Sequence, residues 1–204
     1  DPPCYIEHIF RESSLKVIQD HNASEPLFHM HSFHLLHTPL EVPKSYLAKI
    51  DRIVKAKGGK PFDDRSRRLY HAMVLYLDET VGTLIEALKT KGIWNKTLVV
   101  FSSDNGGPVY IPAGANNHPL RGAKYSDFEG GIRTNAFVAG GWLPESLRGT
   151  RHQGVISIAD WYATFCVLAG IDPVDRPSNR SVPPTDGINI WPALLANANG
   201  TTSP

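Results

Sequence analysis

The sequence has little cysteine, no long hydrophobic run and no excess of charge of one sign. Its 204 residues include 2 Cys, too few for a disulfide framework. No apolar stretch approaches the roughly 18–20 residues that a membrane-spanning helix needs. The chain has 21 Lys and Arg against 20 Asp and Glu, and this balance is not that of a dedicated nucleic-acid or membrane-surface binder. We therefore expect no nucleic-acid partner and no membrane span.

The rest of the composition is that of a globular protein. Hydrophobic residues make up 41% and charged residues 20%, enough to bury a core and unlike a disordered chain. The length fits one domain or part of one. The opening residues, Asp1-Pro-Pro-Cys4, contain neither a start methionine nor a signal peptide, so we expect a processed chain or a fragment.

The residues that follow several asparagines indicate the cellular compartment of the protein. Four Asn residues are followed two positions later by Ser or Thr, the acceptor pattern for N-glycosylation: Asn22, Asn95, Asn179 and Asn199. One match would be chance, but four favour the secretory pathway. We expect a lysosomal or extracellular protein.

Apolar spacing predicts alternating helices and strands. Helices are expected at residues 5–20, within 44–63, at 64–91 and at 156–168, and strands at 27–33, 97–101 and 134–139. The alternation predicts an α/β fold with a mostly parallel sheet. In such sheets, ligand-binding groups lie just beyond the carboxyl ends of the strands. His37 follows the first expected strand, and Asp104 and Asn105 follow the second.

Several polar groups each admit two interpretations. Asp104 and Asn105 could supply hard oxygen ligands for Ca²⁺ or Mg²⁺, or the Asn-Gly step could simply form a turn. Lys124, in a Gly-rich loop, could contact an anion or be an ordinary surface lysine. His29 and His31, in the first expected strand, could bind zinc as a pair, although satisfied core or edge histidines are commoner. The basic stretch Lys49–Arg68 could bind a sulfated or phosphorylated polymer, although a solvated helix face is commoner.

Three motifs carry a resemblance to a known family. The chain resembles the sulfatases, most closely the arylsulfatase B branch, over about residues 5–195. The motifs occur in the family's order and approximate spacing: His37-Thr-Pro-Leu-Glu-Val-Pro43, Phe101-Ser-Ser-Asp-Asn-Gly-Gly107, and Pro119-Leu-Arg-Gly-Ala-Lys124 with Glu129-Gly-Gly-Ile-Arg133.

The resemblance implies an alkaline-phosphatase-like α/β sandwich, incomplete here, and Ca²⁺-dependent hydrolysis of sulfate esters by a formylglycine made from cysteine. By motif match, Asp104 and Asn105 are calcium ligands, and His37 and Lys124 contact the sulfate and the leaving oxygen. The chemistry agrees, because a divalent cation and a lysine stabilise charge on sulfate oxygens and an imidazole can protonate a leaving oxygen. The implied partner is a sulfate ester, with a sulfated glycan as one candidate.

One departure from the family is decisive for activity. The family nucleophile lies in Cys-x-Pro-Ser-Arg, which surrounds neither Cys4 nor Cys166. We therefore expect residues 1–204 to be a partial catalytic domain, its second half, with the N-terminal nucleophile region and the C-terminal subdomain missing. A mature, non-catalytic module that binds sulfate or a sulfated glycan is the alternative.

Overall fold

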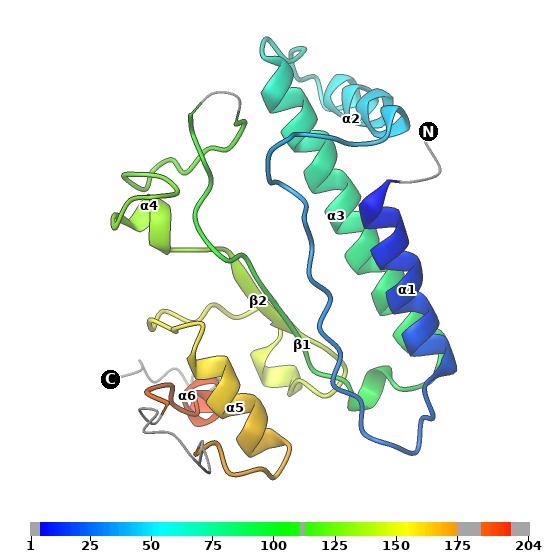
Figure 1. The fold of residues 1–204 in the computed structure, drawn as a ribbon, viewed down its shortest axis with the longest axis vertical. Coiled ribbons are helices and arrows are strands. Elements are labelled where there is room, and N and C mark those ends of the chain that lie inside the picture. Colours follow the sequence, from blue (N-terminus) through cyan, green and yellow to red (C-terminus); the bar gives the residue numbers. More distant parts are fainter. Residues whose placement is uncertain (1–4, 111–112, 175–184, 197–204) are drawn as a thin grey trace, which may run out of the picture. The chain divides into compact units, whose positions relative to one another are not determined.

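The computed structural model describes residues 5–110, 113–174 and 185–196 (Figure 1). The chain divides into two compact units, with the boundary between Trp142 and Leu143. None of the helices in the described ranges is both long enough and apolar enough to cross a lipid bilayer. Cys4 and the acceptor residues Asn179 and Asn199 lie outside the described residues.

Three helices form the framework of the first unit. They are α1 (Ile6–Asp20), α2 (Lys44–Ala56) and α3 (Arg65–Thr90), and both α1 and α2 pack on α3. The Asp64 carboxylate caps α3 by accepting a hydrogen bond from the Arg67 amide at 2.7 Å, which satisfies one of the amides left unpaired at a helix start. The expected helices at 5–20, within 44–63 and at 64–91 are confirmed. Their packing buries Ile18, Ile50, Ala72, Met73 and Tyr76.

The strand expected at residues 27–33 does not form. The segment has no strand or helix assignment. Leu27 and residues 29–33 make no backbone hydrogen bond to a described residue. Apolar alternation can predict an extended chain, but a strand also needs a neighbouring chain to complete its hydrogen-bond ladder. In Figure 1 the segment runs as a loop beside α1.

The sheet of this unit has two strands. In it, β1 (Val99–Ser102) pairs with β2 (Ala136–Ala139), with Val99 opposite Ala139 and Ser102 opposite Ala136. Both expected strands are confirmed, but the pair is antiparallel. Between them, the described residues of the segment 103–135 contain only the short helix α4 (Glu129–Ile132), rather than the long crossover helix that a parallel pair requires. The short 3₁₀ helix η1 (Trp94–Lys96) leads into β1.

The second unit is built around α5 (Asp160–Leu168), with the 3₁₀ helix η2 (Glu145–Leu147) and α6 (Trp191–Ala196). The Asp160 carboxylate accepts hydrogen bonds from the Ser157 and Ile188 amides at 2.8 and 3.0 Å. The expected helix at 156–168 is confirmed from Asp160 onward. Cys166 is a free thiol and is partly buried.

Candidate functional site

The loop after β1 presents two oxygen-bearing side chains. Asp104 is exposed, and its carboxylate makes no hydrogen bond or ion pair to a described residue. The Asn105 amide nitrogen donates to the Gly106 carbonyl at 2.9 Å, while its side-chain oxygen accepts nothing from the described residues. The loop therefore offers two side chains whose oxygens accept no hydrogen bond from the described residues.

Glycine allows this loop to pack directly on the loop around α4. The Gly106 amide donates to the Gly131 carbonyl at 2.8 Å, and the Gly130 amide donates to the Arg121 carbonyl at 2.7 Å. A Cβ atom at Gly106 would clash with the Gly130 carbonyl and lie 2.9 Å from Gly131 Cα. Because both sides of the contact are backbone, neither can move aside cheaply. The Gly-Gly pairs therefore set the distance between the two loops.

Replacing Gly106 by Ala is expected to lower the free energy of unfolding by about 3 kcal/mol, because overpacking against backbone forces both loops apart. Urea denaturation followed by circular dichroism measures this change. The matched control is Gly82→Ala in α3, where a Cβ would meet nothing within 4 Å; it should raise stability by about 0.5–1 kcal/mol, since alanine favours the helix. An equal effect of the two substitutions would contradict the assigned role of Gly106.

Contacts between the same two loops also place Lys124 near the loop of Asp104 and Asn105. The Lys124 amide donates to the Gly107 carbonyl at 3.3 Å. The Asn117 side chain bridges the two loops: its amide nitrogen donates to the Gly107 carbonyl at 2.7 Å and to the Gly122 carbonyl at 3.2 Å. The structure thus brings three of the four predicted residues onto one loop cluster. Sequence reasoning missed Asn117, whose only signal was an amide in a Gly-rich loop.

Two non-glycine residues with left-handed backbone flank the predicted site. Leu36, beside His37, has a φ of 71°, and Tyr125, beside Lys124, has a φ of 74°. Residues other than glycine rarely adopt this backbone conformation. It persists only where surrounding contacts impose it, often at functional sites. His37 and Lys124 therefore each lie next to a residue with constrained backbone. The Lys124 ammonium lies 5.4 Å from the Tyr125 ring centre, within range of a cation–π contact.

His37 shares no hydrogen bond or ion pair with the other three residues. It is exposed, and its Nδ1 lies 2.7 Å from the Thr38 carbonyl. A carbonyl can only accept, so Nδ1 carries the proton and Nε2 of the neutral ring is left as an acceptor. To donate a proton from Nε2, His37 must therefore first be in its doubly protonated form.

The donor chemistry of Asp104 and Asn105 fits calcium as part of a ligand set. Ca²⁺ takes 6–8 oxygen ligands, from carboxylates, amides and backbone carbonyls. Two uncommitted oxygen-bearing groups are adjacent here. In the part of the chain that the structure describes, no group of three His, Cys, Asp or Glu could hold a metal ion. Asp104 and Asn105 would therefore be two ligands of a site that needs further oxygens.

A family model described as "Sulfatase" matches residues 2–171. The chain belongs to the sulfatase family. It is 31% identical over 204 residues to arylsulfatase J of Mus musculus, covering 100% of this chain and 30% of that protein. A sulfatase of Formosa agariphila is 32% identical over 180 residues, covering 82% of this chain and 30% of the relative.

Solved structures share the fold of this sulfatase chain. The crystal structure of Ps i-CgsB superposes with a TM-score of 0.75 at 32% identity, over 95% of this chain and 39% of that one. The complex of Ps i-CgsB with k-i-k-neocarrahexaose gives a TM-score of 0.74 at 31% identity, over 95% of this chain and 39% of that one. The expected alkaline-phosphatase-like α/β class is therefore confirmed. The chain spans about a third of the length of the relatives it matches.

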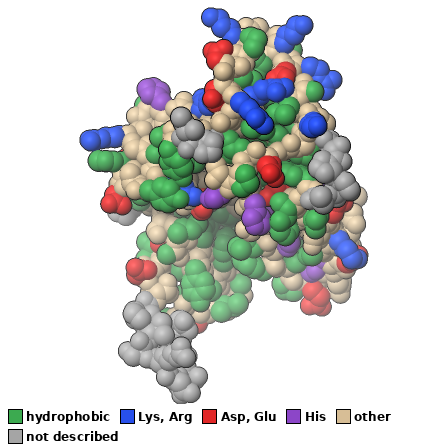
Figure 2. All heavy atoms as spheres, turned by 45° about the horizontal axis from the view of Figure 1, so that its top comes forward, with side chains coloured by type: hydrophobic (Ala, Val, Ile, Leu, Met, Phe, Trp, Pro, Cys, Tyr) green, Lys and Arg blue, Asp and Glu red, His purple; other side chains and the backbone are tan. Residues whose placement is uncertain are grey.

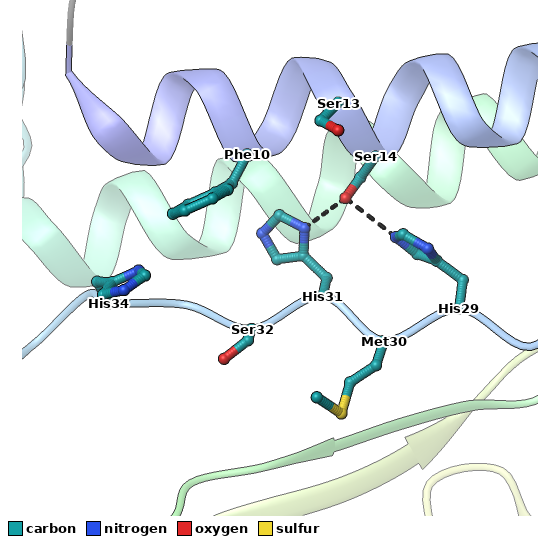
Figure 3. Close-up of a pocket in the computed structure, with 8 residues that line it drawn as sticks. All are labelled: Phe10, Ser13, Ser14, His29, Met30, His31, Ser32 and His34. Carbon is teal, nitrogen blue, oxygen red and sulfur yellow. Dashed lines mark hydrogen bonds between the residues drawn. The ribbon is translucent and has the colours of Figure 1, made fainter.

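The histidine pair of this sulfatase chain lies in a pocket of about 270 Å³ beside α1 (Figure 3). The buried Ser14 hydroxyl lies between the two rings, 3.0 Å from His29 Nε2 and 2.7 Å from His31 Nδ1. Both rings are thereby bonded to a serine, and no third metal ligand joins them among the described residues. These contacts favour a structural role over a zinc pair, although His31 Nε2 is buried and has no hydrogen-bond partner among the described residues.

Sequence reasoning also missed Glu7, which is only 2% exposed. Its carboxylate accepts a hydrogen bond from the His34 amide at 2.9 Å and so fastens α1 to the extended segment. Burial raises the pKa of Glu7, although the hydrogen bond and the charge of His34 oppose the rise. A carboxylate among the apolar positions of a helix was the available signal.

His31 predicts a pH effect on stability. Burial, followed by the charge of His29, lowers the pKa of His31 below 6.5. Because the folded chain then holds fewer protons than the unfolded chain, this contribution to stability is present above pH 6.5 and lost as the pH falls through the lowered folded pKa. Thermal unfolding at about pH 7 and about pH 5 should show a smaller acid loss of Tm for His31→Gln than for the parent.

The control for this pH effect is His21→Gln, because the His21 ring bonds the Glu25 carbonyl in an exposed position. That variant should keep the acid loss of the parent chain. An unchanged acid loss in His31→Gln would show that the buried imidazole contributes nothing to the pH dependence.

Proposed function

We propose that this chain is the second half of a sulfatase catalytic domain, which hydrolyses sulfate esters with Ca²⁺ once it is joined to the segment that carries the nucleophile. The observation that carries the proposal is the loop cluster after β1. Its backbone hydrogen bonds bring the oxygen donors of Asp104 and Asn105 beside the loop of Lys124. An anion-recognising lysine next to hard metal ligands is the combination that sulfate chemistry needs.

Each side chain has a separate task in the proposed reaction. Calcium, held in part by Asp104 and Asn105, supplies positive charge to the sulfate oxygens when bound. Lys124 adds a point charge that attracts the anion in both ground and transition states. His37 carries the proton for the leaving oxygen on Nε2 while the Thr38 carbonyl fixes its Nδ1. Neither Cys4 nor Cys166 lies in the family's nucleophile motif, so the nucleophile would come from elsewhere in a longer protein.

The proposed substrate is a sulfate ester on a sugar. Relatives include N-acetylgalactosamine-6-sulfatase of Homo sapiens, 35% identical over 141 residues, covering 67% of this chain and 25% of that protein. Ps i-CgsB was crystallised with an oligosaccharide, k-i-k-neocarrahexaose. Both names point to sugar ligands, which supports a sulfated glycan as the partner of this chain.

Glycan acceptor sites support a proposed secretory, lysosomal or extracellular location. Asn22 and Asn95 are both exposed, as acceptors must be. Expression through a eukaryotic secretory route should add glycans, seen as a mass increase of the Asn95 peptide that an amidase removes. An unmodified Asn95 peptide from that route would count against the location.

Turnover of an aryl sulfate tests the proposal. A longer polypeptide from the same gene, carrying a Cys-x-Pro-Ser-Arg motif matured to formylglycine, should hydrolyse 4-nitrophenyl sulfate with Ca²⁺. The chain of 204 residues alone should show no turnover. Binding of sulfated glycans without hydrolysis by the longer polypeptide would favour the non-catalytic module instead. Hydrolysis by the 204-residue chain alone would overturn the assigned division of the catalytic domain.

A further inference from the structure

The positive charge of this chain is concentrated at α2 and the start of α3. Residues Lys44–Arg68 hold nine Lys and Arg against three Asp, whereas the rest of the chain holds twelve Lys and Arg against seventeen Asp and Glu. Figure 2 shows Lys and Arg side chains gathered at the top of the view, where α2 meets the start of α3. The near-zero total charge therefore hides one strongly basic region.

Most of these cations have no acidic partner. Three of the nine are engaged: Lys49 pairs with Glu79, Arg68 pairs with Asp51, and Arg67 donates to the Gly114 carbonyl. The other six are exposed and make no ion pair with a described residue; we call them the basic surface: Lys44, Arg52, Lys55, Lys57, Lys60 and Arg65. Two nearby acids, Asp63 and Asp64, offset part of this charge, and Asp64 is engaged as the cap of α3.

Two lysines on other helices have acids placed beside them. Lys16 pairs with Asp20 at 2.5 Å and Lys89 pairs with Glu86 at 2.6 Å, each within one turn of its helix. On α2 the single acid is Asp51, and Arg68 of α3 takes it. The six cations therefore repel one another with only partial compensation from nearby acids, a cost to stability that a bound polyanion would reduce.

We propose that the basic surface binds a sulfated polysaccharide chain. The cations are spread along α2 and the following turn rather than converging on a point, and Lys44 to Lys57 spans about 20 Å at the rise of an α-helix. A row of this kind matches a polymer with repeated negative charges better than a single sulfate ion. The choice of a sulfated glycan over other polyanions rests on the proposed function.

The composition of the basic surface disfavours a membrane. The outward positions of α2 are Lys44, Ser45, Ala48, Asp51, Arg52 and Lys55, none with a large apolar side chain. Peripheral membrane helices combine cations with apolar groups that enter the lipid. A polymer held by charge alone remains in solution and can be released by salt, which suits a substrate chain that must move.

The test measures binding of the 204-residue chain to dextran sulfate, with unsulfated dextran and a DNA duplex of equal charge as comparisons. Binding to dextran sulfate should weaken steeply with salt, as counterion release requires, and unsulfated dextran should not bind. The combined variant Lys55→Gln, Lys57→Gln, Lys60→Gln should bind dextran sulfate roughly tenfold more weakly. Circular dichroism checks that the variant keeps the parent's Tm.

The control removes the same charge elsewhere, at Lys16, Lys89 and Lys96, which lie on other elements. That variant should bind dextran sulfate as the parent does. Equal weakening in both variants would show that net charge alone governs binding and would overturn the proposal, as would tighter binding to the DNA duplex. Turnover of a small aryl sulfate by the longer polypeptide should not respond to the Lys55, Lys57 and Lys60 substitutions. If dextran sulfate binds but the longer polypeptide shows no turnover, the proposed function is contradicted, whereas binding by the basic surface is still supported.

Discussion

Replacing Asp104 by Ala in the longer sulfatase should lower turnover of an aryl sulfate by about a thousandfold or more, because a charged ligand of a catalytic cation is lost. In the structure this carboxylate is exposed and makes no hydrogen bond or ion pair to a described residue, so its removal should barely change stability. The loss should therefore appear in kcat and in the dependence on Ca²⁺, with Tm unchanged.

Two further substitutions make the Asp104 result specific. Asp104→Asn keeps an oxygen donor and removes the charge, so its turnover should partly recover as the Ca²⁺ concentration rises. Asp78→Ala removes an exposed carboxylate on α3 and should leave turnover unchanged. If Asp104→Ala retains full activity, or if Asp78→Ala loses as much, the loop after β1 is not part of a calcium site.

His37→Ala should lower turnover of a sugar sulfate by about a hundred- to a thousandfold. Its effect on an activated aryl sulfate should be much smaller. A sugar alcohol is a poor leaving group and needs a proton, whereas an activated phenolate leaves without one. The Thr38 carbonyl holds Nδ1, so only Nε2 can deliver that proton. The measurement is kcat for both substrates with the same enzyme preparation.

Lys124→Ala provides the contrast for His37. A lysine that contacts the sulfate acts on both substrates alike, so its loss should lower both rates equally and weaken inhibition by free sulfate. Equal losses on the two substrates in His37→Ala would make His37 a positioning residue for sulfate. No loss on either substrate would leave it an ordinary surface histidine.

The local sequence was sufficient to predict the four longer helices. The apolar spacing of residues 64–91 and the cap at Asp64 act within one or two turns, and α3 forms as expected. The motif after β1 likewise placed Asp104 and Asn105 at the end of a strand. Local chemistry could not distinguish metal ligands from a turn, because the same Asp-Asn-Gly-Gly residues serve both.

Contacts between distant residues were beyond such reasoning. The close approach of Gly106 to Gly130 and the Asn117 bridge join positions that no periodicity relates. At residues 27–33, by contrast, a local pattern predicts an element that the distant contacts do not form. The alternation of this segment predicts a strand, yet its histidines bond to Ser14 of α1 and the backbone of residues 29–33 pairs with no described neighbour.

The sequence by itself determined the four longer helices, the two strands that pair, the family and the four candidate residues, because each depends on residues near one another in the chain. Only the tertiary structure decided that Lys124 lies beside the loop of Asp104 and that β1 and β2 run antiparallel. Such outcomes depend on hydrogen bonds and backbone packing between segments that are far apart in sequence, and these form only when the chain folds.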